Sequence, residues 1–544
     1  LCGTQINNIL LPIQYLRTKL LIMAAILIAC CILVFLLIFY TAKHKSSYWK
    51  RRKVPYLEPA PLLGNYSEYI LLKKYVGHVS QELCQRFTEE PYVGAFYGTE
   101  PTLIVQDLEL VKLIMTKDFY FFNGREISKY THRELLTQNL FFTYGDKWKV
   151  LRQNLSPLFS SAKMRNMFPL IENCSRVFEA ILDEETKSSS VLEVRGLMAR
   201  YTMDCIGSCA FGVDTNTMKE AQDNPFKYIG NAIFDTRNSR ALKNVTRAIW
   251  PAIFYGLGMR AFPKEIDDFF SKLLKGIFQG RDYKPSARND FVDLILKLKT
   301  EKYMSGDGFK ANADKKISLE IDDDILIAQC VLFFAAGYET TATTSSFTLF
   351  ELAKNTEAQD RVVEEVDVYL QRHDNKLKYD CITELPYLEA CVDEALRLYP
   401  VLGVITREVV DDYDLPSGLK LEKGLRIHLP VYHLHHNPEY FPKPYEYRPE
   451  RFFKDEKKNV RPYSYIPFGE GPRVCIGKRF AKMQLLAGLL TLFKKYRVEL
   501  AEGQSKTINF EPRAIVTQPL GGINLKFVVR EGWEQRVWKT PQVC

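Results

Sequence analysis

One cysteine, Cys475, lies in a loop rich in glycine and proline, directly before an apolar run that is typical of a helix. Gly469 and Gly471 let the backbone turn through conformations that are closed to other residues, and Pro472 stiffens the turn. The positive end of the following helix favours a thiolate over a thiol. The loop therefore predicts a single thiolate ligand for an iron, whereas the alternative is a buried structural cysteine.

An acid and an alcohol, Glu339 and Thr340, stand at the centre of a long helix that we expect from about Asp322 to Ala353. A threonine hydroxyl inside a helix can donate to the carbonyl four residues earlier, here that of Ala336, and bend the helix. This pair predicts a space for a small ligand beside a proton donor. The alternative interpretation is a polar kink in a buried helix.

Two helical pairs place a cation beside a second polar group. Glu394 and Arg397 are three residues apart and Trp148 and Arg152 are four apart, so each pair shares a helix face. An exposed ion pair contributes little to stability, and a tryptophan beside an arginine can be simple packing. An indole N–H with a guanidinium also suits a carboxylate.

These stretches together resemble the cytochromes P450. The loop Phe468-Gly469-Glu470-Gly471-Pro472-Arg473-Val474-Cys475-Ile476-Gly477 matches every fixed position of that family's haem-binding signature, Phe-x-x-Gly-x-Arg-x-Cys-x-Gly. The family patterns are also matched, in order, by Trp148 with Arg152, Ala336-Gly337-Tyr338-Glu339-Thr340-Thr341, Leu396-Arg397-Leu398-Tyr399-Pro400 and Pro449-Glu450-Arg451-Phe452. The chain looks closest to the insect microsomal family-six enzymes that metabolise xenobiotics.

The resemblance implies a mainly α fold with small β-sheets and a haem b (iron protoporphyrin IX) whose iron is bound by Cys475. It implies that Thr340 hydrogen-bonds the bound dioxygen and that Glu339 connects the proton supply. Glu394, Arg397 and Arg451 would form a buried structural ion triad behind the haem loop. The remaining cofactor-binding positions implied are Trp148, Arg152, Arg407, Arg473, Phe468, Gly469, Gly477 and Ala336. Arg125 is a weaker candidate, because its surroundings depart from the Asp-Arg-Gly of the insect branch.

The implied function is that of a monooxygenase, which inserts one oxygen atom from O2 into apolar small molecules such as plant allelochemicals, insecticides or endogenous lipids. Electrons would come from NADPH through a flavoprotein reductase, with cytochrome b5 as a further partner. The alternatives are a thiolate-haem isomerase or dehydratase that needs no reductase, and a non-catalytic haem protein that binds a gas. The pair Glu339 and Thr340 argues against the isomerase or dehydratase, as does an anchor that places the enzyme beside a reductase. The sequence does not exclude a gas-binding protein, which would have little need for Thr340.

From the same resemblance we also expect a substrate pocket and a docking surface for a partner protein. An apolar substrate pocket is expected near residues 120–130, 333–334, 402–404 and 515–516, although such walls do not name a ligand. A basic face suited to an acidic partner is expected from Lys147, Lys149, Arg473, Lys478, Arg479 and Lys482.

The composition of the chain limits which fold classes and partners are plausible. The 544 residues contain no obvious linker or repeat, and 46% of them are hydrophobic, which favours one large helical body. The net charge of +9 is spread along the chain and no nucleic-acid motif accompanies it, which argues against a nucleic-acid partner. The 12 cysteines lack metal-ligand spacing, so disulfides are not expected and a reducing compartment fits better.

The N-terminus predicts a single membrane span. Ile22 to Thr41 carries no charge and is long enough to cross a bilayer. Basic residues follow it, which places the rest of the chain in the cytosol. The resemblance to microsomal enzymes implies that the membrane is that of the endoplasmic reticulum. A signal peptide would be shorter, with its basic residues in front. Met23 at the start of this run predicts that residues 1–22 are untranslated upstream sequence. We expect an anchor at 1–42, a basic and proline-rich hinge at 43–65, the catalytic domain at 66–530 and a tail at 531–544 without an assignable role.

Local patterns predict the other elements. A hairpin is expected from 93–97 and 102–105, amphipathic helices from about 160 to 290, and a surface loop at 301–316. An ordered meander should lead from Pro430 to Pro467, followed by short strands up to Val529.

Overall fold

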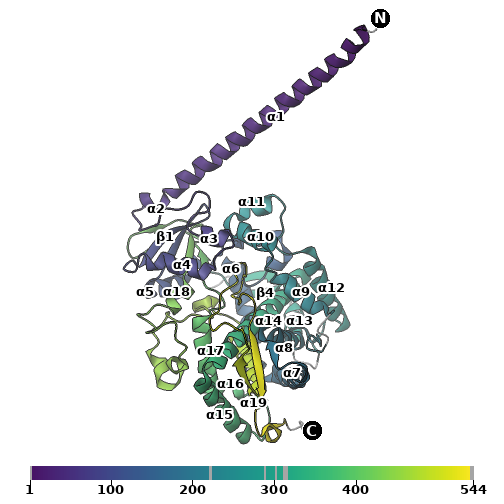
Figure 1. Ribbon diagram of the computed structural model, residues 1–544, viewed down its shortest axis with the longest axis vertical. Coiled ribbons are helices and arrows are strands. Elements are labelled where there is room, and N and C mark those ends of the chain that lie inside the picture. Colours follow the sequence, from purple (N-terminus) through teal and green to yellow (C-terminus); the bar gives the residue numbers. More distant parts are fainter. Residues whose placement is uncertain (1–2, 220–222, 287–289, 301–302, 310–315, 539–544) are drawn as a thin grey trace.

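The structure is a computed structural model that describes residues 3–219, 223–286, 290–300, 303–309 and 316–538 (Figure 1). The body is mainly helical with small sheets, as predicted. Its α-helices are α1 (Gly3–Ser46), α2 (Tyr48–Arg51), α3 (Ser67–Ile70), α4 (Val76–Gln85), α5 (Leu108–Lys112), α6 (Gly145–Leu155), α7 (Ser161–Ser188), α8 (Val194–Ile206), α9 (Pro225–Ile233), α10 (Asn238–Ile249), α11 (Pro251–Gly256), α12 (Lys264–Gly280), α13 (Phe291–Thr300), α14 (Asp323–Lys354), α15 (Thr356–Arg372), α16 (Cys381–Glu384), α17 (Pro386–Leu398), α18 (Val431–His435) and α19 (Lys478–Lys495).

The strands form small sheets whose neighbours are often distant in sequence. One sheet has the order β1 (Tyr92–Tyr97), β2 (Glu100–Val105), β9 (Arg426–Leu429) and β6 (Ile405–Glu408). A second has the order β10 (Tyr496–Leu500), β11 (Asn524–Val529) and β3 (Val191–Glu193). Two-stranded pairs are formed by β4 (Tyr303–Asp307) with β5 (Lys316–Glu320), and by β7 (Tyr413–Asp414) with β8 (Lys420–Leu421).

The long helix α14 runs through the body, and its boundaries agree with the prediction. Asp322 caps its N-terminus, with the side chain accepting a hydrogen bond from the Ile325 N–H at 2.7 Å. The helix packs closely on α8 at Gly337, where an added Cβ would lie 2.7 Å from Cδ1 of Ile206. Gly337 is therefore needed for helix packing as well as for space near the predicted haem.

The predicted hairpin is β1 and β2, which pair antiparallel with Val93 opposite Ile104. The segment that we expected to act as a hinge packs against this hairpin. Trp49 is fully buried and its Nε1 donates to the carbonyl of Ala95 at 2.8 Å, while Gly94 N donates to Pro55 O, also at 2.8 Å. Much of this basic, proline-rich stretch is thus held against the body.

The surface loop expected at 301–316 is wrong for the described part, which contains the hairpin β4 and β5. Polar side chains of α6 hold this hairpin in place. Gln153 Oε1 accepts from Asp307 N at 3.0 Å, and Lys149 Nζ donates to Gly308 O at 2.9 Å. Because those partners lie about 150 residues earlier in the chain, the polar composition alone could not reveal the strands. Residues 301–302 and 310–315 lie outside the described residues.

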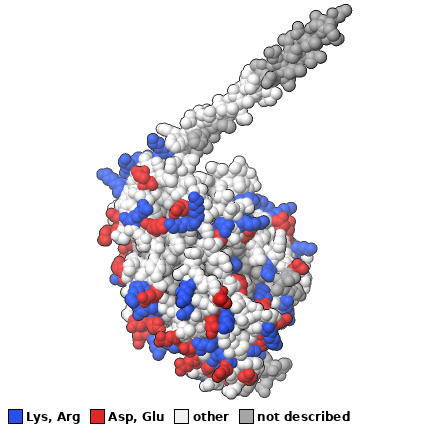
Figure 2. Space-filling model, viewed as in Figure 1, with Lys and Arg blue, Asp and Glu red and all other residues white. Residues whose placement is uncertain are grey.

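Helix α1 extends away from the body (Figure 1). Its described apolar side chains are open to the surroundings, with Leu20 63% and Leu27 65% exposed. Figure 2 shows the part of α1 nearest the body mostly in white, with basic residues at its base, whereas both signs of charge cover the viewed face of the body. Within the described residues, the one helix long and apolar enough to cross a membrane is α14, which is mostly buried; Lys19–Cys30 of α1 is apolar but shorter.

Candidate functional site

A cavity of about 340 Å³ lies between α14, the Cys475 loop and α6. It is lined by every cofactor-binding position predicted from the sequence: Cys475, Trp148, Arg152, Arg407, Arg473, Phe468, Gly469, Gly477 and Ala336. Thr340 lines it as well, from α14. Residues that are more than 300 positions apart in the chain thus face one space. Their individual roles toward a cofactor stay predictions.

The turn before Cys475 has the backbone that its glycines predict. Gly469 and Gly471 have φ values of +68° and +69°, which other residues adopt only with strain. A Cβ on Gly471 would also overlap the carbonyl of Met115, so no larger residue fits there. Cys475 N donates to Phe468 O at 2.9 Å, which closes the loop immediately before α19 begins.

The Cys475 sulfur is exposed to the cavity but enclosed by protein. Burial raises the pKa of the Cys475 thiol, and this effect exceeds the opposing ones of the Gly477 N–H and of the Arg152 and Lys478 charges. The net direction is opposite to the one predicted from the helix end alone, because that prediction left out desolvation. A metal ion reverses this balance, since its charge deprotonates a coordinating thiol.

Four guanidinium groups, those of Arg125, Arg152, Arg407 and Arg473, line the same cavity. Within the described residues none of them forms an ion pair, and Nε of Arg125, Arg407 and Arg473 is buried without a hydrogen-bond partner. Burial lowers the pKa of Arg125 to about 10, and burial with the Arg125 charge lowers that of Arg407 to about 9. Such a cluster is compensated by a ligand with more than one negative charge, and the two propionates of a haem fit it.

Arg473 points inward, so its place in the predicted outer basic face is wrong. Its Nη2 donates to the carbonyl of Asn123 at 2.7 Å, and its guanidinium lies 4.6 Å from the centre of the Trp148 ring. Burial and the three neighbouring cations lower its pKa. Of the other residues expected in that face, Lys482 pairs with Glu389 at 2.8 Å, whereas Lys478 and Arg479 are exposed.

Side chains satisfy three consecutive carbonyls of α14 beside the cavity. Thr340 Oγ1 donates to Ala336 O at 2.6 Å, which confirms the predicted bond. Gln484 of α19 donates to Gly337 O, and Thr202 of α8 to Tyr338 O, at 2.7 and 3.0 Å. We did not predict Gln484 or Thr202, although an isolated glutamine in the apolar run of α19 is a signal that could have identified the first.

Glu339 lies outside the cavity lining, although its neighbour Thr340 belongs to it. The Glu339 carboxylate is buried, forms an ion pair with Arg195 and accepts from Nε2 of Gln518 at 2.9 Å. Consecutive residues of a helix point about 100° apart, which separates the acid from the alcohol. The predicted proton connection between them remains untested.

The ion triad behind the loop is present as a geometric unit. Arg397 and Glu394 are both fully buried and joined by two hydrogen bonds of 2.8 Å, and Arg451 Nε lies 3.4 Å from the same carboxylate. Arg397 also donates to the carbonyl of His435 at 2.9 Å. Burial lowers the pKa of His435 to about 3, so its neutral Nε2 accepts from Ile466 N at 3.0 Å, just before the cysteine loop.

The apolar wall predicted from sequence is correct in part. Phe333 and Leu402 line the cavity, whereas Phe334 packs against the rings of Phe211 and Phe270 in the core. From the other two segments, only Arg125 of 120–130 reaches the cavity and neither Ile515 nor Val516 lines it. Side chains that were not predicted complete the wall: Ile206, Cys209, Ala210, Phe159 and Met164.

Comparison with known proteins agrees with this geometry. A family model described as cytochrome P450 matches residues 54–527. Cytochrome P450 6B2 of Helicoverpa armigera is 35% identical over 488 residues, which cover 89% of this chain and 94% of the relative. Cytochrome P450 6a8 of Drosophila melanogaster is 34% identical over 492 residues, 90% of this chain and 96% of the relative. Cytochrome P450 6k1 of Blattella germanica is 32% identical over 511 residues, 93% of this chain and 97% of the relative.

Proposed function

This chain belongs to the cytochrome P450 family and is a P450 monooxygenase, and we propose that it oxidises apolar small molecules at the cavity between Cys475 and Thr340. The observation that carries the proposal is the convergence on one cavity of a cysteine, a threonine and four guanidinium groups that form no ion pair within the described part of the chain. The substrates we propose are xenobiotics, such as plant allelochemicals or insecticides, or endogenous lipids.

Haem b, when bound at Cys475, supplies the oxygen activation that amino-acid side chains cannot provide. We assign Trp148, Arg152, Arg407 and Arg473 to its propionates, and we add Arg125, which the sequence ranked lower. Phe468, Gly469, Gly477 and Ala336 leave room for the flat ring. An added Cβ on Gly477 would have no protein atom within 4 Å, although this residue lines the cavity.

Thr340 is proposed to hold a proton at the cavity, which is supported by a hydroxyl that can donate to a ligand in place of the Ala336 carbonyl. Glu339 is proposed to supply protons from the buried side of α14. It can do so only by exchanging its bonds to Arg195 and Gln518, so these two residues regulate the transfer.

Electrons are proposed to come from NADPH through a flavoprotein reductase, with cytochrome b5 as a second donor. The exposed cations Lys478 and Arg479, beside the Cys475 loop, support docking of an acidic partner at this side. No nucleic-acid partner is proposed.

We propose that residues 1–42 anchor the protein in the endoplasmic reticulum membrane, with the catalytic domain in the cytosol. Support comes from the exposed apolar side chains of α1 and the basic residues at its C-terminal end. Helices α10 and α11 lie at the end of the body from which α1 leaves (Figure 1). The exposed apolar residues of this stretch are Leu242 in α10, Ile253 in α11 and Leu257 directly after α11. These side chains would meet the same membrane surface.

The cysteine assignment is tested by the carbon monoxide difference spectrum of the dithionite-reduced protein. We expect the strongly red-shifted Soret band of a thiolate-bound haem, because sulfur donates electron density to the iron. Cys475→Ser should lose this shift, and Cys209→Ser, which alters a cysteine of the same cavity, should keep it. An unshifted band in the wild-type protein would contradict the proposal.

Consumption of NADPH separates the proposed activity from its alternatives. In the presence of reductase the monooxygenase should consume NADPH and O2 faster when an apolar substrate is added. An isomerase or dehydratase would convert its substrate without reductase, and a gas-binding protein would give no product. Product formation that is independent of reductase would refute the proposed electron route.

A further inference from the structure

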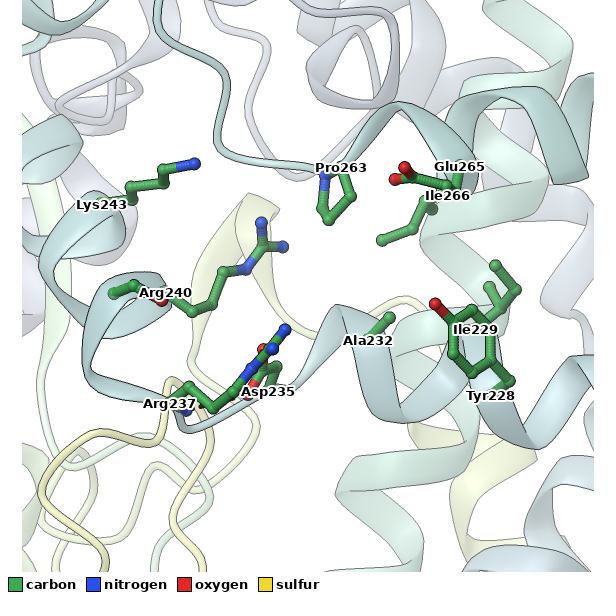
Figure 3. A pocket seen from close by; sticks show the side chains of 11 residues that line it. Tyr228, Ile229, Ala232, Asp235, Arg237, Arg240, Lys243, Pro263, Glu265 and Ile266 are labelled. Atoms are coloured by element: carbon green, nitrogen blue, oxygen red, sulfur yellow. Dashed lines mark hydrogen bonds and ion pairs between the residues drawn. The ribbon is translucent and has the colours of Figure 1, made fainter.

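A second cavity, of about 290 Å³, lies between the segment that joins α9 to α10 and the start of α12 (Figure 3). It shares no lining residue with the cavity at Cys475. Its apolar walls include Ile229, Ala232, Pro263 and Ile266. Three cations also line it, although the oxidation of an apolar substrate does not need them.

Arg240 is the central group of this cavity. Only 6% of the residue is exposed, yet Nε and Nη2 are buried without a hydrogen-bond partner. Among the residues that the structure describes, Arg240 forms no ion pair. Figure 3 shows its guanidinium extending from α10 into the cavity, toward Pro263. The guanidinium lies 5.2 Å from the centre of the Phe262 ring, but a ring face does not accept the in-plane N–H groups. Buried N–H donors without an acceptor are unfavourable, so they indicate a ligand that supplies the missing acceptors.

The other charges around Arg240 leave it available. Asp235 is engaged by Arg237 at 2.6 Å. Arg247 lies 4.0 Å from Glu134. The charge of Arg247 adds to the burial that lowers the pKa of Arg240, and together these effects exceed the opposing ones of the Asp235 and Glu134 charges. Lys243 is exposed and its amino end reaches toward the same space, whereas the Glu265 carboxylate faces it from α12 without an ion pair to Arg240 within the described residues (Figure 3).

We propose that this cavity binds a phosphate group, with Arg240 as its principal ligand and Lys243 as a second cation. A guanidinium presents several N–H donors in one plane, and a phosphate offers enough oxygens to accept from Nε, Nη2 and the lysine together. The cavity opens beside α10, which exposes Leu242 at the end of the body where α1 leaves (Figure 1). The phosphate can therefore belong to a lipid headgroup or be a free anion.

The test is isothermal titration calorimetry of the full-length holoenzyme in a neutral detergent, with inorganic phosphate and with glycerol 3-phosphate. We expect binding by the wild-type protein that weakens at least about tenfold in Arg240→Met, the loss of a charge-assisted contact. Glu265→Gln should bind more tightly, because it removes a competing negative charge. Lys275→Met, which removes an exposed cation from α12, should bind like the wild type.

The carbon monoxide spectrum of each variant shows that the haem site is intact, and Arg240→Lys tests whether charge alone suffices. Tighter binding of glycerol 3-phosphate than of inorganic phosphate would assign the site to a lipid headgroup, and the reverse order to a free anion. Either order supports a phosphate site. The proposal is overturned if the wild-type protein binds neither probe, if Arg240→Met binds as the wild type does, or if Lys275→Met weakens binding equally.

Discussion

Arg397 connects an ion pair, two backbone segments and the cysteine loop through a few direct contacts. It neutralises the buried Glu394 and donates to the carbonyls of His435 and Pro444, at 2.9 and 2.6 Å. His435 in turn accepts the N–H of Ile466. The position of the loop thus depends on a residue that does not touch the cavity.

Replacing Arg397 by leucine should lower the free energy of unfolding by about 3–5 kcal/mol, because the buried carboxylate loses its partner. We expect reduced haem incorporation, measured as the amount of haem per protein after purification. Arg372→Leu is the control, since Arg372 forms an exposed pair with Glu384 and should cost less than about 1 kcal/mol. Equal effects of the two substitutions would contradict the structural role of the triad.

The same substitution has a predictable dependence on pH. Burial already raises the pKa of Glu394, against the opposing effect of Arg397, and loss of Arg397 should raise it further. The folded variant then holds this proton more tightly than the unfolded chain. Its stability falls as pH rises from the ordinary carboxyl pKa to the raised one, so its deficit relative to the wild type should shrink in acid. Glu394→Leu combined with Arg397→Leu should remove this dependence.

At the residue scale, the sequence predicted what depends on local geometry. The spacing of Glu394 and Arg397 fixes their contact on one helix, and the positive φ of Gly469 and Gly471 follows from the residue type. The cavity position predicted for Arg473 agrees with the structure, whereas its place in the outer basic face was wrong, because its carbonyl partners at 123 and 143 are brought there by the fold. The partners of Glu339 were missed for the same reason.

Helix α14, which carries Thr340, contacts helix α19, which follows Cys475. Gln484 is fully buried and its single Nε2 donates both to Gly337 O and to the hydroxyl of Thr341, each at 2.7 Å. These two bonds fix the part of α14 around Gly337 relative to α19. We regard Gln484 as a positioning residue.

Gln484→Leu should lower the free energy of unfolding by about 1–3 kcal/mol, because it leaves buried polar groups without a partner. We also expect less product per NADPH consumed, since Thr340 loses its fixed position above the cavity. Thr202→Val is the matched control, because it removes the bond to Tyr338 O from α8 without touching α19. It should lower stability while changing this coupling less. A stable Gln484→Leu enzyme with unchanged coupling would contradict the assignment.

At the scale of helices and strands, residues that mark the end of an element predicted its position more reliably than the composition of a segment predicted its type. Asp322 marked the start of α14 because a capping side chain is a local signal. The strands β4 and β5 were missed because their polar residues are satisfied by α6, a contact that composition does not encode. Likewise, helical periodicity did not tell which of Phe333 and Phe334 faces the cavity.

Across the whole molecule, α1 contributes few contacts to the body. The ion pair of Lys45 with Glu100, at 2.7 Å, is partly exposed, whereas Trp49 beyond the helix is buried. The mainly helical fold with small sheets was predicted, and the structure agrees. Composition could not predict that the stretch around Trp49 and Pro55 packs on β1, because that contact depends on the shape of the sheet.

A variant that lacks residues 1–45 should keep its carbon monoxide spectrum and lose at most about 1 kcal/mol of stability, the value of an exposed ion pair. It should sediment with microsomes much less than the full chain. Residual sedimentation should disappear when Leu242, Ile253 and Leu257 are also changed to asparagine, because this removes the apolar area that they expose without adding charge. Full membrane binding by the truncated protein would contradict the anchor.

The fit of Gly471 against Met115 has a consequence for protein engineering. The cysteine loop packs tightly against the backbone of a segment that lies more than 350 residues earlier in the chain. In a chimera that takes its C-terminal third from a relative, the cysteine loop of one protein must therefore pack against the Met115 segment of another. The two need not fit, even when each part folds correctly in its own parent protein. More chimeras should fold and bind haem when the stretch around Met115 and the cysteine loop come from the same parent protein. Libraries built from contiguous blocks of sequence will rarely preserve that combination.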